Sequence, residues 1–135
     1  MPNAEYFAGH FDGEGYLTMY RKQGGWCLEA KVDVSYPLVL DAYKAQFGGY
    51  VYASARTVNK NMWKWKLHHQ AQLLLFLQTI EPFSLEKRPQ LLLGIEWLQR
   101  RQTFPQNRVP YDFVLYSNLC ASQLQEMKKI SYPRP

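Results

Sequence analysis

The stretch that decides the fold is Phe7-Ala8-Gly9-His10-Phe11-Asp12-Gly13-Glu14-Gly15. A short helix is predicted over Asn3–Asp12, because Asn is a favourable N-cap and glycines follow its last residue. Gly9 and Gly13 lie four residues apart and therefore share one face of a helix. A glycine in a helix costs up to about 1 kcal/mol relative to alanine. Two of them on one face indicate that another backbone packs closely there.

Two carboxylates, Asp12 and Glu14, stand at the C-terminal end of this helix, where the helix dipole disfavours anions. If two copies of the chain packed through the glycine face, their Glu14 carboxylates would converge. That arrangement is repulsive unless cations lie between the carboxylates. Hard oxygen ligands suit Mg²⁺, so Glu14 is a candidate ligand for Mg²⁺ or another divalent cation.

Length and composition predict one globular domain over residues 1–135. The chain is 47% hydrophobic and 16% aromatic, which argues against disorder. Its longest apolar run, Leu73–Leu77, is far shorter than the ~20 residues of a membrane span. The N-terminal residues do not have the pattern of a signal peptide. We therefore expect a soluble intracellular protein, in a prokaryotic or phage-infected cytoplasm or an organelle, that is not secreted and binds no membrane or organic cofactor.

Positive charge is concentrated in one part of the chain. The net charge is +5, and residues 21–66 contain eight Lys and Arg but only three Asp and Glu. Such a concentration is typical of a surface that faces a polyanion. An ordinary solubilising excess of charge is the alternative interpretation.

Downstream, two antiparallel hairpins alternate with helices. The predicted strands are Tyr16–Lys22, Trp26–Ser35, Tyr50–Val58 and Met62–Leu67, and the later helices are Pro37–Phe47, Gln70–Ile80, Pro89–Gln102 and Asp112–Ile130. Gly48-Gly49 is expected to end the first of these helices. This order predicts an α+β domain with helices on one face of an antiparallel sheet.

The other face of that sheet is predicted from the alternation of side chains along each strand. Leu28, Ala30 and Val32 point towards the helices, as do Trp63 and Trp65. The outward set is polar and rich in lysine: Thr18, Tyr20, Lys22, Glu29, Lys31, Ser54, Arg56, Lys64 and Lys66. A two-stranded ribbon fits the major groove of DNA, where base edges carry a distinguishing code. A solvated sheet face is the alternative, since it also favours Lys and Glu.

Residues 7–15 closely resemble the LAGLIDADG motif of homing endonucleases, in the variant that ends Asp-Gly-Glu-Gly. Further segments resemble the family in the same order: Phe47–Val51, Trp63–Leu67, Ala71–Leu77, Ile80–Phe83 and Lys87–Gln90. The resemblance covers about residues 4–100, and residues 103–135 are expected to be a C-terminal extension that contains a helix.

The resemblance implies an αββαββα fold with a saddle-shaped sheet and a motif helix at a dimer interface, which assigns Phe7, Ala8, Gly9, Phe11 and Asp12 to that interface. It also implies metal binding by Glu14, with the carbonyl of Gly13 as a further ligand, and a place near the active site for Lys87. Members of the family often carry a polar residue at the end of the second strand, but Val34-Ser35-Tyr36 stands there, so Asp33 is a candidate substitute in catalysis. His10 replaces an apolar residue and is expected at the interface or in solvent.

The function implied is site-specific hydrolysis of double-stranded DNA with Mg²⁺ or another divalent cation. One motif per chain implies a homodimer on a pseudo-palindromic site. The alternative is a non-cleaving DNA- or RNA-binding protein on the same fold, such as a maturase or a regulator. The presence of Glu14 favours cleavage, and the unmatched second strand favours the alternative. His68 and His69 are predicted to be strand-end residues or phosphate contacts.

Overall fold

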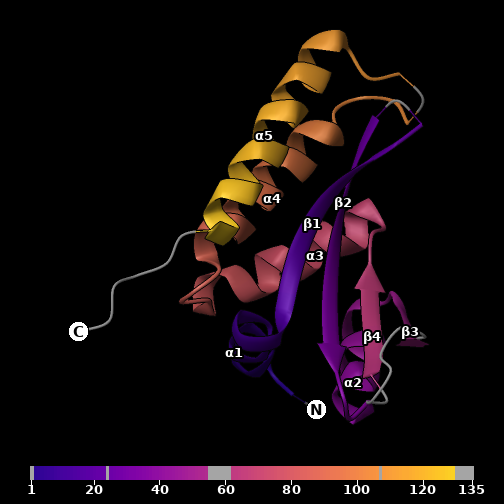
Figure 1. The fold of residues 1–135 in the computed structure, drawn as a ribbon, viewed down its shortest axis with the longest axis vertical. Coiled ribbons are helices and arrows are strands. Elements are labelled where there is room, and N and C mark those ends of the chain that lie inside the picture. Colours follow the sequence, from indigo (N-terminus) through magenta and orange to yellow (C-terminus); the bar gives the residue numbers. More distant parts are fainter. Residues whose placement is uncertain (1, 24, 55–61, 107, 130–135) are drawn as a thin grey trace.

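A computed structural model describes residues 2–23, 25–54, 62–106 and 108–129 (Figure 1). The elements in chain order are α1 (Ala4–Glu14), β1 (Gly15–Lys22), β2 (Gly25–Val34), α2 (Leu38–Phe47), β3 (Tyr50–Ser54), β4 (Met62–Leu67), α3 (Gln70–Ile80), the 3-10 turn η1 (Glu81–Phe83), α4 (Arg88–Arg101) and α5 (Tyr111–Lys129). The predicted α+β class and the αββαββα order are confirmed.

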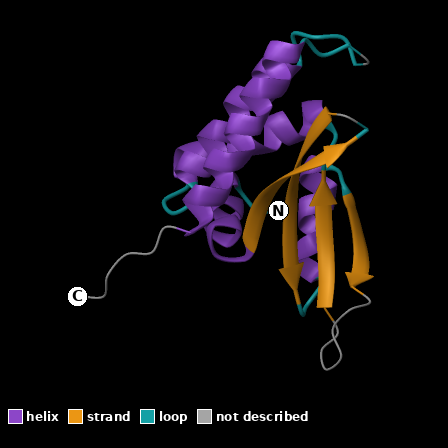
Figure 2. Cartoon of the chain, turned by 45° about the horizontal axis from the view of Figure 1, so that its top comes forward, coloured by secondary structure: helices purple, strands orange, loops and turns teal. Residues whose placement is uncertain are grey.

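The described strands form one antiparallel sheet in the order β1-β2-β4-β3. The two hairpins are therefore joined through β2 and β4, where Lys31 lies opposite Lys66 and Asp33 opposite Lys64. Figure 2 shows the strands side by side, with helices packed against the sheet. Alternate residues of β2, including Leu28, point into the buried core, so one face of the sheet is covered and the other carries polar side chains.

The core lies between the sheet and helices α1, α2 and α3. Trp65 is fully buried in the core, as predicted, and its indole N–H donates to the carbonyl of Gly48 at 2.8 Å. Gly49 has φ of 84°, and a Cβ on it would lie 2.3 Å from the carbonyl oxygen of Lys66. Only glycine fits such a position, which explains why Gly48-Gly49 ends α2 and turns the chain into β3.

Helices α4 and α5 lie side by side and extend the core past the hairpin β1–β2 (Figure 1). Phe113 and Cys120 of α5 belong to the same buried cluster as the residues of the sheet. The indole of Trp97 donates to the hydroxyl of Ser117 at 2.9 Å, which connects the two helices. Helix α5 therefore packs as part of the hydrophobic core.

The differences from the predicted elements are small. Helix α1 continues to Glu14, since Gly13 stays helical and the N–H of Gly15 closes the last turn on Phe11. Residues 55–58 of the predicted third strand, the turn that follows it and Ile130 lie outside the described residues. Within the described ranges, no helix is long and apolar enough to cross a membrane.

Candidate nucleic-acid interface and active site

Helix α1 has a buried face and an open face. Phe7 and Phe11 are 1% and 0% exposed, and Ala8 is fully buried as well. Their side chains pack in the core of their own chain, where Phe11 contacts Phe76 edge to face. The side chains of Phe7, Ala8 and Phe11 are therefore used within their own chain, and the assignment of these residues to a dimer interface stays a prediction.

The open face of α1 carries the two glycines. A Cβ built on Gly9 or on Gly13 would have nothing within 4 Å. Tyr6 and Glu5 are exposed beside them. The shared face expected from their spacing is confirmed, and it leaves room for the backbone of another helix to approach α1 closely.

Asp12 lies near the same helix end but does not face outwards. Its carboxylate is buried and accepts hydrogen bonds from the hydroxyl of Ser84 and from the backbone N–H groups of Leu85, Glu86 and Lys87. Burial alone would raise the pKa of Asp12, but these four donors outweigh it and lower the pKa. The side chain of Asp12 thus joins α1 to the segment before α4, and the assignment of Asp12 to a dimer interface stays a prediction.

Two of the three residues assigned to catalysis, Glu14 and Lys87, lie at the C-terminal end of α1. Glu14 is the last residue of α1, and its side chain is exposed. Lys87 stands at the N-cap of α4, 73 positions along the chain from Glu14, and its ammonium donates to the backbone carbonyl of Asp12. The C-terminal end of α1 therefore carries an exposed carboxylate and an ammonium group from a different part of the chain.

The donor set at this helix end consists of hard oxygens. The carboxylate of Glu14 and the backbone carbonyl of Gly13 are the groups that Mg²⁺ prefers. Among the described residues, no three His, Cys, Asp or Glu side chains come together in a way that could hold a metal ion. The binding of a divalent cation by Glu14 and the carbonyl of Gly13 stays a prediction for this chain.

The cross-strand register places the predicted DNA contacts on the open face of the sheet. Thr18 lies opposite Glu29 and Tyr20 opposite Cys27, while Ser54 lies at the described end of β3. Lys22, Lys31, Lys64 and Lys66 bring four positive charges to the two hairpins. Arg56, the remaining predicted contact, lies outside the described residues.

Glu29 differs from the prediction of a solvent-facing contact. It lies on the open face but is only 3% exposed. Its carboxylate lies 3.1 Å from the ammonium of Lys31 and 3.8 Å from that of Lys66. Burial lowers the pKa of Lys66, but the nearby Glu29 raises it, and the net shift is upwards. Glu29 is therefore the centre of an ion-pair triad on the sheet, covered by the two lysines that it binds.

Asp33 is also engaged by its neighbours. Its carboxylate lies 3.6 Å from the ammonium of Lys64 and accepts a hydrogen bond of 3.3 Å from the hydroxyl of Tyr16. Burial, together with the charge of Asp33, raises the pKa of Tyr16 to about 12. Asp33 lies on the open face of the sheet, as expected, and its catalytic role stays a prediction.

Three tyrosines of the open face are not among the contacts predicted from the sequence. Tyr16 and Tyr52 lie beneath the ammonium groups of Lys31 and Lys66, at 5.9 and 5.8 Å from the ring centres. Tyr50 is exposed near the end of the sheet. Period-two alternation contained the signal for Tyr50 and Tyr52, since they share parity with Ser54.

The histidines have different surroundings. The ring of His10 is hydrogen-bonded to the hydroxyl of Tyr43 at 2.8 Å, and burial lowers its pKa against an opposing effect of Glu14. His10 therefore packs beside α2, in a half-buried site that the prediction of an interface or solvent position did not include. His68 and His69 are exposed directly after β4, which confirms their strand-end position.

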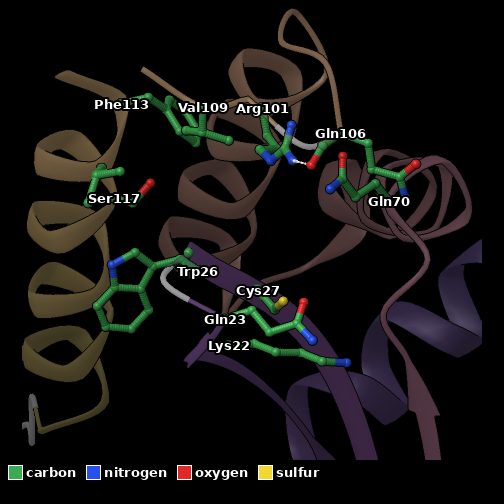
Figure 3. Close-up of a pocket in the computed structure, with 12 residues that line it drawn as sticks. Lys22, Gln23, Trp26, Cys27, Gln70, Arg101, Gln106, Val109, Phe113 and Ser117 are labelled. Carbon is green, nitrogen blue, oxygen red and sulfur yellow. Dashed lines mark hydrogen bonds between the residues drawn. The ribbon is translucent and has the colours of Figure 1, made fainter. Parts of the chain in front are cut away.

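A cavity of about 540 Å³ lies at the opposite end of β1 from Glu14, between the hairpin tip and the α4–α5 connection (Figure 3). Lys22 and Cys27 lie on one side of it, and Gln70 lies with Arg101 on the other. The guanidinium of Arg101 donates to the backbone carbonyls of residues 104, 105 and 106. These bonds give Arg101 a structural role in closing the connection between the two helices.

Comparison with solved structures establishes the fold. The archaeal intron-encoded homing endonuclease I-Vdi141I, complexed with DNA, superposes with a TM-score of 0.79 at 17% identity, over 98% of this chain and 87% of its own. The homing endonuclease I-TnaI gives a TM-score of 0.73 at 15% identity, over 95% of each chain. The chain has the LAGLIDADG homing endonuclease fold. No protein-family model and no curated protein sequence matches it.

This chain also matches about half of a longer LAGLIDADG protein. The LAGLIDADG meganuclease I-AabMI, bound to uncleaved DNA, superposes with a TM-score of 0.77 at 13% identity. The match covers 99% of this chain but only 52% of I-AabMI. One copy of the present chain is therefore equivalent in extent to about half of that LAGLIDADG protein.

Proposed function

We propose that this protein is a site-specific endonuclease that cleaves double-stranded DNA with Mg²⁺ or another divalent cation. The observation that carries the proposal is that Glu14 and Lys87 both lie at the C-terminal end of α1, in a chain with the LAGLIDADG homing endonuclease fold. An exposed carboxylate beside an ammonium group combines a cation ligand with a partner for phosphate.

Each of the two residues has a distinct task in phosphodiester hydrolysis. Glu14, with the carbonyl of Gly13, would hold the cation, which when bound polarises the phosphate and supplies an activated water. Lys87 would lie against the scissile phosphate and stabilise the negative charge that grows on its oxygens. Asp33 is the remaining candidate for orienting water, once Lys64 turns from it to a phosphate.

The open face of the sheet is the proposed DNA-binding surface. Lysines such as Lys31, Lys64 and Lys66 would contact phosphates and base edges, and Thr18 and Tyr20 would contact base edges in the major groove. The solved structures of I-Vdi141I and I-AabMI hold DNA. Their fold equivalence supports DNA as the partner of this chain.

A homodimer completes the proposed site. Gly9 and Gly13 leave the outer face of α1 open to the backbone of a second α1. Because one chain brings a single Glu14, two copies related by a two-fold axis would place one carboxylate beside each strand of the duplex. Such a dimer would recognise a pseudo-palindromic sequence.

A second candidate function is a non-cleaving DNA- or RNA-binding protein, such as a maturase or regulator. It is favoured by the state of Asp33, whose carboxylate is already paired with Lys64 and Tyr16. On this alternative the open face would bind nucleic acid and Glu14 would have no chemical task.

Cleavage of a randomised duplex library distinguishes the two functions. The protein is incubated with the library in Mg²⁺, with and without EDTA, and the new ends are sequenced. Ends at one pseudo-palindromic sequence that disappear with EDTA are the expected result. Enrichment of bound duplexes without new ends would overturn the endonuclease and support the binding protein. A Glu126→Gln variant controls for loss of a remote carboxylate, since Glu126 lies on the exposed surface of α5.

A further inference from the structure

We infer that Asp12 is a positioning residue that holds Lys87 beside Glu14, an inference that rests on the proposed endonuclease function. Asp12 lies two residues before Glu14 in α1, and its carboxylate and its backbone carbonyl both contact the segment that carries Lys87. We refer to Asp12 together with Ser84–Lys87 as the latch.

The carboxylate of Asp12 holds the backbone of the latch. One oxygen accepts from the Ser84 hydroxyl and, at 3.2 Å, from the N–H of Lys87. The other accepts from the N–H groups of Leu85 at 2.7 Å and Glu86 at 3.2 Å. Both oxygens are therefore used, and three successive N–H groups of the segment before α4 converge on one anion. Consecutive backbone N–H groups that point into one concavity bind anions, and here the anion belongs to the chain itself.

The side chain of Lys87 makes a second contact within the latch, from α4 back to α1. Its ammonium donates to the backbone carbonyl of Asp12 in the last turn of α1. Carbonyls of a last helical turn lack partners within the helix and favour a positive charge. Residues 12 and 87 are thus joined twice, by a carboxylate that fixes the backbone of Lys87 and by an ammonium that returns to the backbone of Asp12.

The position of Lys87 relative to Glu14 follows from these contacts. Between η1 and α4 the chain has no regular secondary structure, and Leu85 is 90% exposed. The carboxylate of Asp12 supplies the hydrogen bonds of three consecutive N–H groups in this segment. Without that carboxylate the segment loses its anchor, and the ammonium of Lys87 is no longer directed to the end of α1. Asp12 would then affect cleavage without touching DNA.

The first test measures the latch directly, on the full-length protein. Hydrogen exchange of the amides of residues 85–87 and the rate of acetylation of the Lys87 amine are compared in wild type and Asp12→Asn. We expect both rates to rise about tenfold in the variant, which corresponds to an opening equilibrium shifted by one order of magnitude. Ser84→Ala keeps the carboxylate and its three backbone bonds, so it should show a smaller rise. Asn3→Ala removes a side-chain cap from the other end of α1 and should change neither rate.

The second test asks whether Asp12 acts through Lys87 in cleavage. Single-turnover rates at saturating DNA are measured for Asp12→Asn, Lys87→Ala and the double variant, each corrected for the folded fraction by near-ultraviolet circular dichroism. We expect each single variant to lose roughly 10²-fold, as for removal of one electrostatic stabiliser. The double variant should be no slower than Lys87→Ala, because residues that act as a unit are not additive. The DNA affinity of Asp12→Asn should stay within about twofold of wild type.

The outcomes separate the latch from the proposed function. Unchanged labelling of Lys87 in Asp12→Asn, or multiplicative losses in the double variant, would overturn the positioning role. If Asp12→Asn does not fold, Ser84→Ala decides the labelling test, and its failure to raise the rates would overturn the latch. A wild-type protein that cuts no DNA refutes the endonuclease, while exchange and acetylation still decide whether Asp12 holds Lys87.

Discussion

The ion-pair triad of Glu29, Lys31 and Lys66 gives a quantitative prediction for DNA binding. The open face carries four lysines and two carboxylates in the described residues, and Glu29 neutralises part of the charge of two of those lysines. Glu29→Gln retains the shape of the side chain but removes its negative charge. We therefore expect the variant to bind duplex DNA more tightly at low salt and with a steeper dependence on salt.

The magnitude follows from counterion release. Each additional positive charge that meets a phosphate steepens the slope of log affinity against log salt by about 0.9. Removal of the Glu29 carboxylate should therefore steepen the slope of log affinity against log salt by about 0.9. A drop in salt from about 200 to about 50 mM should then raise the affinity of Glu29→Gln about 3.5-fold more than that of wild type.

Fluorescence anisotropy with a labelled duplex of arbitrary sequence, titrated at several salt concentrations, measures this slope. Glu126→Gln is the matched control, because it makes the same chemical change in an exposed pair with Lys129 on α5. Lys64→Ala provides the opposite change and should lower the slope by about one counterion. A slope for Glu29→Gln that equals wild type or Glu126→Gln would refute the open face as the DNA-binding surface.

Three further predictions concern α1. Glu14→Gln should lose cleavage by at least about 10²-fold while DNA affinity stays within about twofold, and a variant that still cuts refutes the ligand role of Glu14. Gly9→Trp should fold, because a Cβ there meets nothing within 4 Å, but should sediment as a monomer; dimers as stable as those of wild type would contradict the interface. Because the pKa of Asp12 is lowered in the folded state, its contribution to stability is complete above the usual value near 3.8 and is lost as the pH falls through the folded value. Urea midpoints measured between pH 5 and pH 2.5 should therefore fall more for wild type than for Asp12→Asn, and equal falls would refute this assignment.

Local sequence patterns were sufficient for most of the secondary structure. Strands β1, β2 and β4 follow period-two alternation, and Gly48-Gly49 marks the turn after α2 because no other residue fits Gly49. The place of Glu14 and Lys87 came from the motif resemblance, since nothing local indicates that residues so distant in sequence meet. Helical periodicity places Phe7 about 200° around the helix from Gly9, so the two cannot share a face.

The remaining features depend on contacts between distant segments. The burial of Glu29 requires Lys66 to lie on the neighbouring strand, and the pairing of β2 with β4 is a property of the assembled sheet. Alternation along a strand predicts on which face of the sheet a side chain lies, but it does not predict which neighbouring side chains bury it. Asp12 likewise has partners more than 70 positions away, at Ser84 and the residues that follow. Its burial could not be inferred from a helix end that looked exposed.

Helix α1 packs into the core with one face and leaves the opposite face, which carries the glycines, open. The glycine face of α1 shares no residue with the polar face of the sheet, and the core between them contains Phe7, Phe11 and Trp65. In the proposed homodimer, association and recognition would therefore depend on different residues of one chain. Two chains that differ only on the sheet would still pair through identical helices, and such a mixed dimer would select a target whose halves differ. Under this proposal, target preference would diversify one half at a time without loss of assembly.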